Sequence, residues 1–321
     1  MGTRTADVYR SFAEIEARNV SPVFHEWASA VAADPQVLAL IEALPPTKRQ
    51  PNLVFAAARF LGAPAGPYPV FRCWLLEHWA RTDRVIRERS TQTNEAGRCA
   101  VLLPVLSRLE GPLALIEAGA SAGLCLYPDR YSYRYGAGGR IVALDPAGGP
   151  SPVRLACRID EGSVPDSIPD VVWRSGVDLN PVDVRRPAEL RWLEALVWPE
   201  HDERRRRLHA AANLVAAAPP RLVRGDLVET VMELVQGAPP GARVVVFHSA
   251  VLVYLEPERR ARFVDVMRSL PEVTWISNEG ERVLPRITEL VKVPVNGRTI
   301  LSVNGVPAAL VGPHGQSYEA L

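Results

Sequence analysis

The chain has 321 residues, of which 47% are hydrophobic and 23% are charged, and its formal net charge is +1. This length and composition are typical of a globular protein with two domains, each with its own core. A net charge so close to zero gives no overall attraction to nucleic acid or to an anionic membrane, so we expect neither as a partner. The densest basic run, Arg204–Arg207, follows Asp202 and Glu203 in an expected helix and is interpreted as a solvated face.

The cysteines and the N-terminal segment indicate a cytoplasmic protein without a metal site. None of the cysteines forms C-x-x-C or lies beside a histidine at metal-ligand spacing, so we expect buried, reduced thiols. The first 18 residues carry charges throughout and lack the apolar core of a signal peptide. No apolar run approaches the roughly 20 residues of a membrane span. The cysteines are Cys73, Cys99, Cys125 and Cys157.

The first third of the chain has the pattern of a helical domain. Ser21-Pro22 and Asp34-Pro35 each place an N-cap residue before a proline at the first helical position, which marks two helix starts. Gly111-Pro112 ends this region, so we expect a helical N-terminal domain over residues 1–110. The predicted helices cover residues 22–33, 35–44, 53–61, 70–89 and 94–109.

From residue 111 onward, strands alternate with helices. This alternation predicts a mostly parallel sheet with crossover helices, so we expect an α/β domain over residues 111–321. We expect a helix to start after the glycine-containing turn that follows the first strand. Asn296-Gly297 is a hairpin signal within residues 291–303. The other expected strands cover residues 113–116, 170–178, 222–224, 243–247 and 273–276, and the expected helices cover residues 187–196, 201–217, 228–236 and 257–270.

The first candidate ligand-binding segment follows the first strand of this domain and has the spacing Glu117-x-Gly119-x-Ser121-x-Gly123. Glycines at such a turn let the backbone bend tightly and approach a ligand closely. Glu117 is placed to accept hydrogen bonds from the amine of a cationic ligand. A dinucleotide fingerprint requires the different spacing G-x-G-x-x-G. The alternative interpretation is an ordinary turn between a strand and a helix.

Acidic residues also end two later strands. Asp178, followed by Asn180 and Pro181, is placed to accept from both hydroxyls of a ribose, or else it forms an Asx turn. Asp226, followed by Leu227, is placed to accept from an adenine amino group, or else it is a helix N-cap.

A histidine ends the most strand-like segment of the chain. His248 follows an apolar run over residues 244–247, and open α/β sheets bind ligands at the carboxyl ends of such strands. The imidazole either faces a ligand cleft, where it accepts a proton near neutral pH, or supports the floor of that cleft.

In this order, the segments resemble those of Rossmann-like methyltransferases that use S-adenosylmethionine. The resemblance implies that the first segment holds the methionine part of the cofactor, that Asp178 holds the ribose and that Asp226 lies near the adenine. It also implies that the segment around His248 lines the methyl-transfer pocket. The cofactor-binding residues implied in this way are Glu117, Gly119, Ala120, Ser121, Gly123, Asp178, Asn180, Asp226, Leu227 and His248.

The chain also resembles, over nearly its full length, an uncharacterised bacterial family, domain of unknown function 2332. This resemblance implies no activity. It rests on the stretches Gln92–Glu95 with Arg98, Glu117–Leu124, Trp173–Asp183, Arg191–Glu200, Val223–Asp226, Val246–Ser249 and Trp275–Glu279.

Two features depart from the methyltransferase pattern. Ser121 stands where many methyltransferases have glycine, and the distance from Gly123 to Asp178 is far longer than the roughly 20 residues usual before a ribose acid. We therefore expect a β-rich insertion over about 125–170, with short antiparallel strands, serving as a lid, a substrate wall or the arm of a homodimer. Alternatively, Asp145 in this insertion is the ribose acid.

The sequence thus predicts an S-adenosylmethionine-dependent methyltransferase whose small-molecule acceptor binds between the two domains. A nicotinamide-dependent oxidoreductase and a catalytically silent binding protein of the same fold are the alternatives. Methyl transfer needs mainly proximity, alignment and exclusion of water, and a general base helps with some acceptors. His248 is the first candidate base, and Tyr254, Glu279 and Glu95 are candidates for positioning the acceptor.

Overall fold

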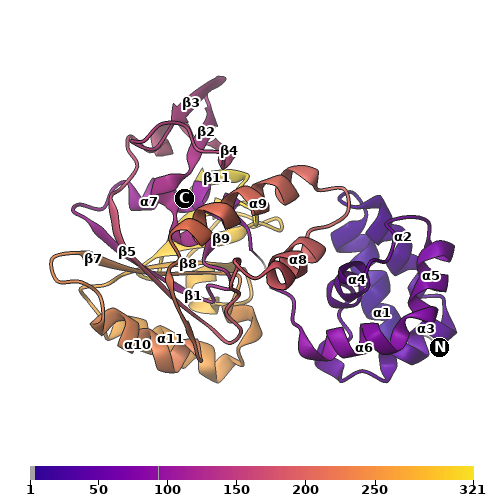
Figure 1. Ribbon diagram of the computed structural model, residues 1–321. Helices are drawn as coiled ribbons and strands as arrows, with labels where there is room; N and C mark the ends of the chain where they lie inside the picture. Colours follow the sequence, from indigo (N-terminus) through magenta and orange to yellow (C-terminus); the bar gives the residue numbers. More distant parts are fainter. Residues whose placement is uncertain (1–3, 93) are drawn as a thin grey trace. The chain divides into compact units, whose positions relative to one another are not determined.

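The computed structural model describes residues 4–92 and 94–321. The chain divides into two compact units (Figure 1). The first combines the described part of Met1–Thr93 with Arg185–Arg206, and the second combines Asn94–Val184 with Arg207–Leu321.

This division differs from the expected boundary at residue 110, because the segment expected as the last helix of the first domain belongs to the second unit. That segment forms a short 3-10 turn, η3 (Ala96–Arg98), followed by helix α7 (Cys99–Leu106). Every residue of α7 is buried, since the helix is apolar on all sides and must be covered all round.

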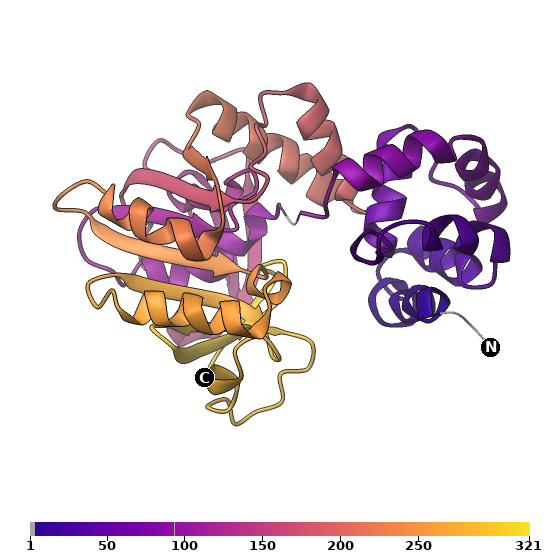
Figure 2. The ribbon, with the colours of Figure 1, turned by 90° about the horizontal axis from the view of Figure 1, so that it is seen from below.

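The first unit is built of helices (Figure 2). Both predicted helix starts are confirmed. The Ser21 hydroxyl accepts from Phe24 N at 3.1 Å at the start of α2 (Pro22–Val31), and the Asp34 carboxylate accepts from Gln36 N and Val37 N at the start of α3 (Pro35–Glu42). The remaining elements of this unit are α1 (Arg4–Ser11), the π-helix η1 (Phe12–Ala17), η2 (Pro46–Lys48), α4 (Pro51–Phe60), α5 (Tyr68–Glu77), α6 (Trp79–Glu88) and α8 (Pro187–Leu196).

The helix expected over residues 70–89 is two helices, α5 and α6, which meet at His78. The His78 ring stacks on Trp74, and its Nδ1 lies 2.9 Å from the Trp74 carbonyl oxygen. No helix among the described residues is both long enough and apolar enough to cross a membrane.

The second unit contains an eleven-stranded sheet, counted over the described residues, in the order β3-β2-β4-β11-β10-β9-β8-β7-β1-β5-β6. The five strands from β8 to β6 are parallel, and β9, β10 and β11 follow as antiparallel neighbours. The unit is therefore α/β with a mixed, mostly parallel sheet. Its strands are β1 (Leu113–Ala118), β2 (Ser132–Ala137), β3 (Arg140–Leu144), β4 (Arg154–Ile159), β5 (Val171–Asp178), β6 (Arg221–Arg224), β7 (Arg243–Ser249), β8 (Thr274–Gly280), β9 (Thr299–Val303), β10 (Val306–Val311) and β11 (Ser317–Ala320).

Helices α10 and α11 lie together along one face of this sheet (Figures 1 and 2). The helical elements of the second unit, besides η3 and α7, are η4 (Leu124–Leu126), η5 (Pro128–Arg130), η6 (Glu161–Ser163), most of α9 (Asp202–Ala217), α10 (Leu227–Gln236), η7 (Leu252–Tyr254), α11 (Pro257–Arg268) and α12 (Pro285–Thr288).

The expected β-rich insertion is present, but it differs from the prediction in two respects. β2 and β3 form the expected antiparallel pair, whereas β4 is parallel to both of its neighbours, β2 and β11. The prediction of a helix after the glycine turn is wrong, since only the one-turn elements η4 and η5 follow the turn. Pro128 lies directly after this segment and cannot continue a helix that began at Leu124.

The hairpin predicted at Asn296-Gly297 is also wrong. Asn296-Gly297 and Asn304-Gly305 both adopt the positive φ angles that a tight hairpin turn requires. Only Asn304-Gly305 joins two paired strands, β9 and β10. Within the described chain, residues 291–295 belong to no strand, and Pro294 among them lacks the N–H that a sheet ladder uses.

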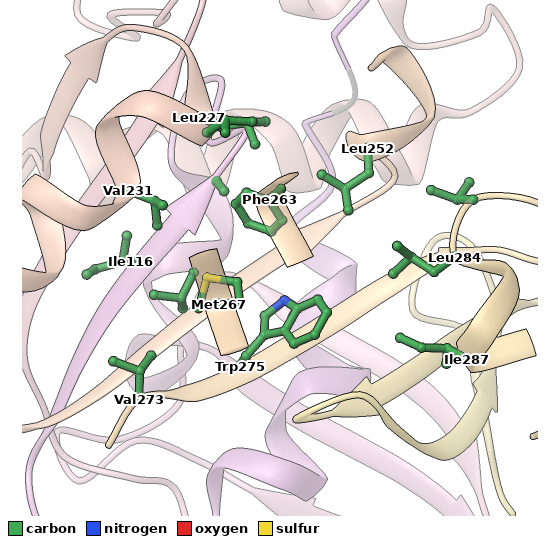
Figure 3. Close-up of a cluster of buried hydrophobic side chains, with 14 of the residues drawn as sticks. Ile116, Leu227, Val231, Leu252, Phe263, Met267, Val273, Trp275, Leu284 and Ile287 are labelled. Carbon is green, nitrogen blue, oxygen red and sulfur yellow. The ribbon is translucent and has the colours of Figure 1, made fainter. Parts of the chain in front are cut away.

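A hydrophobic cluster fills the space between the sheet and helices α10 and α11 (Figure 3). Ile116 from β1 and Trp275 from β8 contribute to it from the sheet, and Val231, Phe263 and Met267 contribute from the two helices. Burial of each large apolar side chain contributes about 1.5–3 kcal/mol to folding. The cluster therefore fixes the strands whose ends carry the candidate ligand-binding residues.

Candidate functional site

The candidate site lies where the order of the parallel strands reverses. β5 and β6 lie on one side of β1, and β7 and β8 lie on the other. The connections that leave the carboxyl ends of β1 and β7 therefore diverge, and open α/β sheets bind ligands in the crevice outside such a point.

The turn after β1 has a backbone that most residues do not adopt. Gly119, Ser121 and Gly123 all have positive φ angles, of 80°, 47° and 69°. A Cβ atom at Gly119 would lie 2.4 Å from Cγ2 of Val251, so only glycine fits between the turn and the segment after β7. The glycine spacing noted in the sequence thus reflects both the bend and a close approach.

All five backbone N–H groups of this turn are already bonded within the protein. Those of Gly119 and Ala120 donate to the Val177 carbonyl, and that of Gly123 donates to the Ala120 carbonyl. Ser121 N donates to Asp178 Oδ2 at 2.8 Å, and Ala122 N donates to Asn94 Oδ1 at 3.0 Å. The turn therefore has no backbone donor left for a phosphate group.

The side chain of Asn94 also bonds this turn. Its amide oxygen accepts from Ala122 N, and its amide nitrogen donates to the Ser121 hydroxyl at 2.8 Å. Asn94 and the turn both belong to the second unit, so these hydrogen bonds lie within that unit. The sequence singled out the stretch that contains Asn94, but its spacing gave no indication of a bond to the glycine turn.

Glu117 carries a buried carboxylate at the end of β1. The residue is 7% exposed, and its Oε2 atom has no hydrogen-bond partner among the described residues. Burial raises the pKa of Glu117 well above its usual value; nearby Cys125 and Asp178 add to this effect and Arg98 opposes it. Arg98 itself is buried and donates to the carbonyls of Ser249 and Pro313.

Asp178 ends β5, directly beside the turn. Its Oδ2 accepts from Ser121 N, and its Oδ1 accepts from Asn180 N at 2.7 Å, which is the Asx turn that the sequence left as an alternative. Each carboxylate oxygen has two lone pairs, so each retains one acceptor position.

Asp145, the alternative ribose acid, lies at the far edge of the sheet. It follows β3, the first strand in the sheet order, and is paired there with Arg134. It is not brought to the turn, so Asp178 is the acid beside Gly119–Gly123.

Asp226 and Leu227 occupy positions typical of structural residues. Asp226 is the N-cap of α10, where its carboxylate accepts from Val228 N at 2.9 Å, and it also pairs with Arg259. Leu227 is buried in the hydrophobic cluster. This is the N-cap interpretation of Asp226, and adenine contact by either residue stays a prediction.

His248 and Glu279 form a buried pair on neighbouring strands. His248 is 0% exposed, and its Nδ1 lies 2.8 Å from Glu279 Oε1. The same carboxylate oxygen accepts from Val251 N and Leu252 N, both at 3.1 Å. The His248 ring also packs against Phe263 and Trp275. The pair thus fixes the position of the segment after β7. This placement favours the interpretation that His248 supports the floor of the cleft over the interpretation that it transfers a proton.

The other two candidate positioning residues, Tyr254 and Glu95, differ in their exposure. Tyr254, in η7, is 66% exposed. Glu95 is buried, and its Oε1 accepts from Gly97 N and from Arg207 Nε, both at 2.9 Å. Arg207 therefore does not belong to the solvated face expected for Arg204–Arg207, and the spacing of that basic run gave no sign of a buried carboxylate partner.

Backbone strain also marks this edge of the sheet. Among the described residues, the non-glycine residues with positive φ are Ser121, Ala250, Asn296 and Asn304. Asparagine tolerates this conformation, whereas serine and alanine rarely adopt it. Ser121 follows β1 and Ala250 follows β7, so both lie at the reversal of strand order. Strained residues of this kind cluster at functional sites.

We expect Ala250→Gly to stabilise the protein, because glycine adopts a φ of 52° without a Cβ clash. The free energy of unfolding, measured by urea denaturation, should rise by about 0.5–1 kcal/mol. Ala309→Gly, in β10, is the matched control and should lower stability, since glycine weakens a strand interior. Equal destabilisation by both changes would show that Ala250 is not strained.

Comparison with known proteins identifies the family. The family model described as "Uncharacterized protein conserved in bacteria (DUF2332)" matches residues 6–319. The chain is therefore a member of the DUF2332 family, as its sequence resemblance implied. No curated protein and no solved structure matches the chain.

Proposed function

We propose that this protein is an S-adenosylmethionine-dependent methyltransferase that acts on a small molecule, with its cofactor at the carboxyl ends of β1, β5 and β7. The strand order β6-β5-β1-β7-β8 corresponds to the order 3-2-1-4-5 of a Rossmann-like sheet. The reversal at β1 is the point where such sheets bind nucleotide-like ligands.

The observation that carries the proposal is that this edge of the sheet offers acceptors and few donors. Glu117 and Asp178 end neighbouring strands on either side of the turn, and every backbone N–H of Gly119–Gly123 is already bonded. S-adenosylmethionine presents a cationic amine, a sulfonium and two ribose hydroxyls, which are complementary to carboxylates. The pyrophosphate of a nicotinamide cofactor needs backbone donors and a helix N-terminus, and η4 has only three residues.

The residues then have separate roles in the proposed complex. Glu117 accepts from the cofactor amine through the carboxylate oxygen that lacks a partner, and Asp178 accepts from the ribose through its remaining lone pairs. Asn94 fixes the turn by accepting from Ala122 N, and Gly119 allows Val251 to pack closely against the turn. Methyl transfer from a sulfonium is an in-line displacement, so a rigid turn that aligns the cofactor supplies much of what the reaction needs.

The test is a comparison of ligands on the full chain. S-adenosylmethionine and S-adenosylhomocysteine should raise the melting temperature and give a calorimetric binding isotherm, because a ligand selective for the native state stabilises it. NADH and NADPH should do neither. Binding of a nicotinamide cofactor alone would favour the oxidoreductase alternative. Cofactor binding with no methyl transfer to any acceptor in a metabolite panel would favour the catalytically silent binding protein.

We expect Asp178→Ala to weaken S-adenosylmethionine binding by about 1–3 kcal/mol, the range for hydrogen bonds to charged groups. Asp145→Ala is the matched control, since it removes an aspartate that directly follows a strand and accepts from Arg134 at the other edge of the sheet. It should leave the affinity unchanged in the same calorimetric titration. Asp178→Asn retains one of the two acceptor oxygens, so weaker cofactor binding at an unchanged unfolding midpoint would assign the loss to the cofactor contact rather than to folding. The reverse ranking of Asp178 and Asp145 would overturn this assignment.

A further inference from the structure

A pocket lies on the α11 side of the sheet, and none of its lining residues belongs to the candidate cofactor site. It has a volume of about 530 Å³ and lies between one face of α11, the start of β8 and the segment that leads into α12. A volume of this size is typical of small-molecule sites.

The floor of this pocket is apolar. Val264 of α11, Trp275 of β8 and Leu284 and Ile287 near α12 supply most of it. Figure 3 shows Trp275 with Met267 on one side and Leu284 and Ile287 on the other. Trp275 is 3% exposed, so the pocket reaches down to the hydrophobic cluster rather than lying on the surface alone.

The rim of the pocket is strongly basic. Four arginines line it together with a single acid, Asp265. Arg260 is held by the carbonyls of Val253 and Leu255. The guanidinium groups of Arg268, Arg282 and Arg286 have no hydrogen bond or ion pair within the part of the chain that the structure describes. In a chain with a net charge of +1, three unpaired guanidinium groups around one apolar pocket form a local site for an anion.

We propose that this arginine-rimmed pocket binds a small amphipathic anion, with an apolar body on Val264, Trp275 and Ile287 and a carboxylate or phosphate head on Arg282 and Arg286. The guanidinium forks match the bidentate geometry of both head groups. The apolar floor requires a hydrocarbon or aromatic body, so a free inorganic anion does not satisfy the site. The proposal is independent of the proposed methyltransferase activity.

The experiment is calorimetric titration of the full chain with decanoate, decyl phosphate, decanol and inorganic phosphate. Decanoate and decyl phosphate are kept below the concentrations at which they form micelles, and decanol below its solubility limit. Decanoate or decyl phosphate should bind, and the preferred one identifies the head group. Decanol and inorganic phosphate should each bind at least roughly tenfold more weakly, the cost of losing one charge-assisted pair or the apolar contact. Decanol binding as tightly as decanoate would overturn the proposal.

Variants locate the site. Arg282→Gln with Arg286→Gln should weaken decanoate binding roughly tenfold or more. Arg140→Gln with Arg154→Gln makes the same change in net charge on β3 and β4 and should leave it unchanged. Val264→Trp should abolish binding by filling the pocket. Thermal unfolding without added ligand checks that this variant is folded. Equal weakening by both arginine pairs, or tighter binding of an acidic peptide than of any amphiphile, would overturn the proposal.

Discussion

Replacing Glu279 with alanine should lower the free energy of unfolding by about 3–5 kcal/mol, the range for breaking a buried pair by removing one partner. Its Oε1 accepts from His248 Nδ1, Val251 N and Leu252 N, and all three donors would lose their partner in the protein interior. Urea denaturation of the purified variant measures this loss. An unfolding midpoint close to that of the unmodified protein would contradict the structural role of the pair.

Two further variants separate structure from chemistry at this position. Glu279→Gln retains an oxygen that accepts a hydrogen bond and should cost less than half as much as Glu279→Ala. Tyr254→Ala, on the exposed side chain of η7, should change stability by no more than about 0.5 kcal/mol. If His248→Asn abolished methyl transfer and left stability unchanged, His248 would act as the base predicted from the sequence.

Glu117→Gln should remove a dependence of stability on pH. Because burial raises the pKa of Glu117 above its usual value of 4.5, the folded protein retains a proton that the unfolded chain has lost. The contribution of Glu117 to stability is therefore greatest below the usual pKa and falls by about 1.4 kcal/mol per pH unit until the raised pKa is reached. Urea denaturation at several pH values above 4.5 should show the unmodified protein losing stability relative to Glu117→Gln as pH rises.

A matched control is Glu272→Gln, which changes an exposed glutamate and should leave the pH dependence as it is. Parallel curves for the unmodified protein and Glu117→Gln would contradict a raised pKa at Glu117. The same property has a consequence for the proposed cofactor. An ammonium group beside Glu117 favours the ionised carboxylate, so S-adenosylmethionine binding should release a proton, and its measured heat should vary with the ionisation enthalpy of the buffer.

Local sequence signals, such as N-cap residues and hydrophobic spacing, predicted several helices correctly. Ser21 and Asp34 cap the helices they were expected to cap, and α8 covers the predicted residues 187–196. The strands β10 and β11 were not expected, and β4 was expected to be antiparallel. The reason is that these depend on pairing across the chain, as between Arg158 and Ser317, which no local pattern encodes.

The candidate site was also predictable only in part, because some of its residues are marked by local spacing and others are defined by tertiary pairing. Glycine spacing and strand-end acids located Glu117, Gly119 and Asp178, which the sheet brings together. The pairing of His248 with Glu279, and of Arg207 with Glu95, depends on tertiary packing. The sequence thus indicates which side chains end strands, and only the structure distinguishes their polar atoms that are bonded within the protein from those that lack a partner among the described residues.

The position of β11 has a consequence for how the protein is made. Among the described residues, the strands of the insertion join the rest of the sheet only through the pairing of β4 with β11. During synthesis, β4 emerges from the ribosome long before Ser317–Ala320. Until then it presents an unpaired edge, which is the surface through which nascent chains aggregate. We therefore expect protease to cleave the insertion more readily in a chain stalled on the ribosome before Ser317 than in the complete chain.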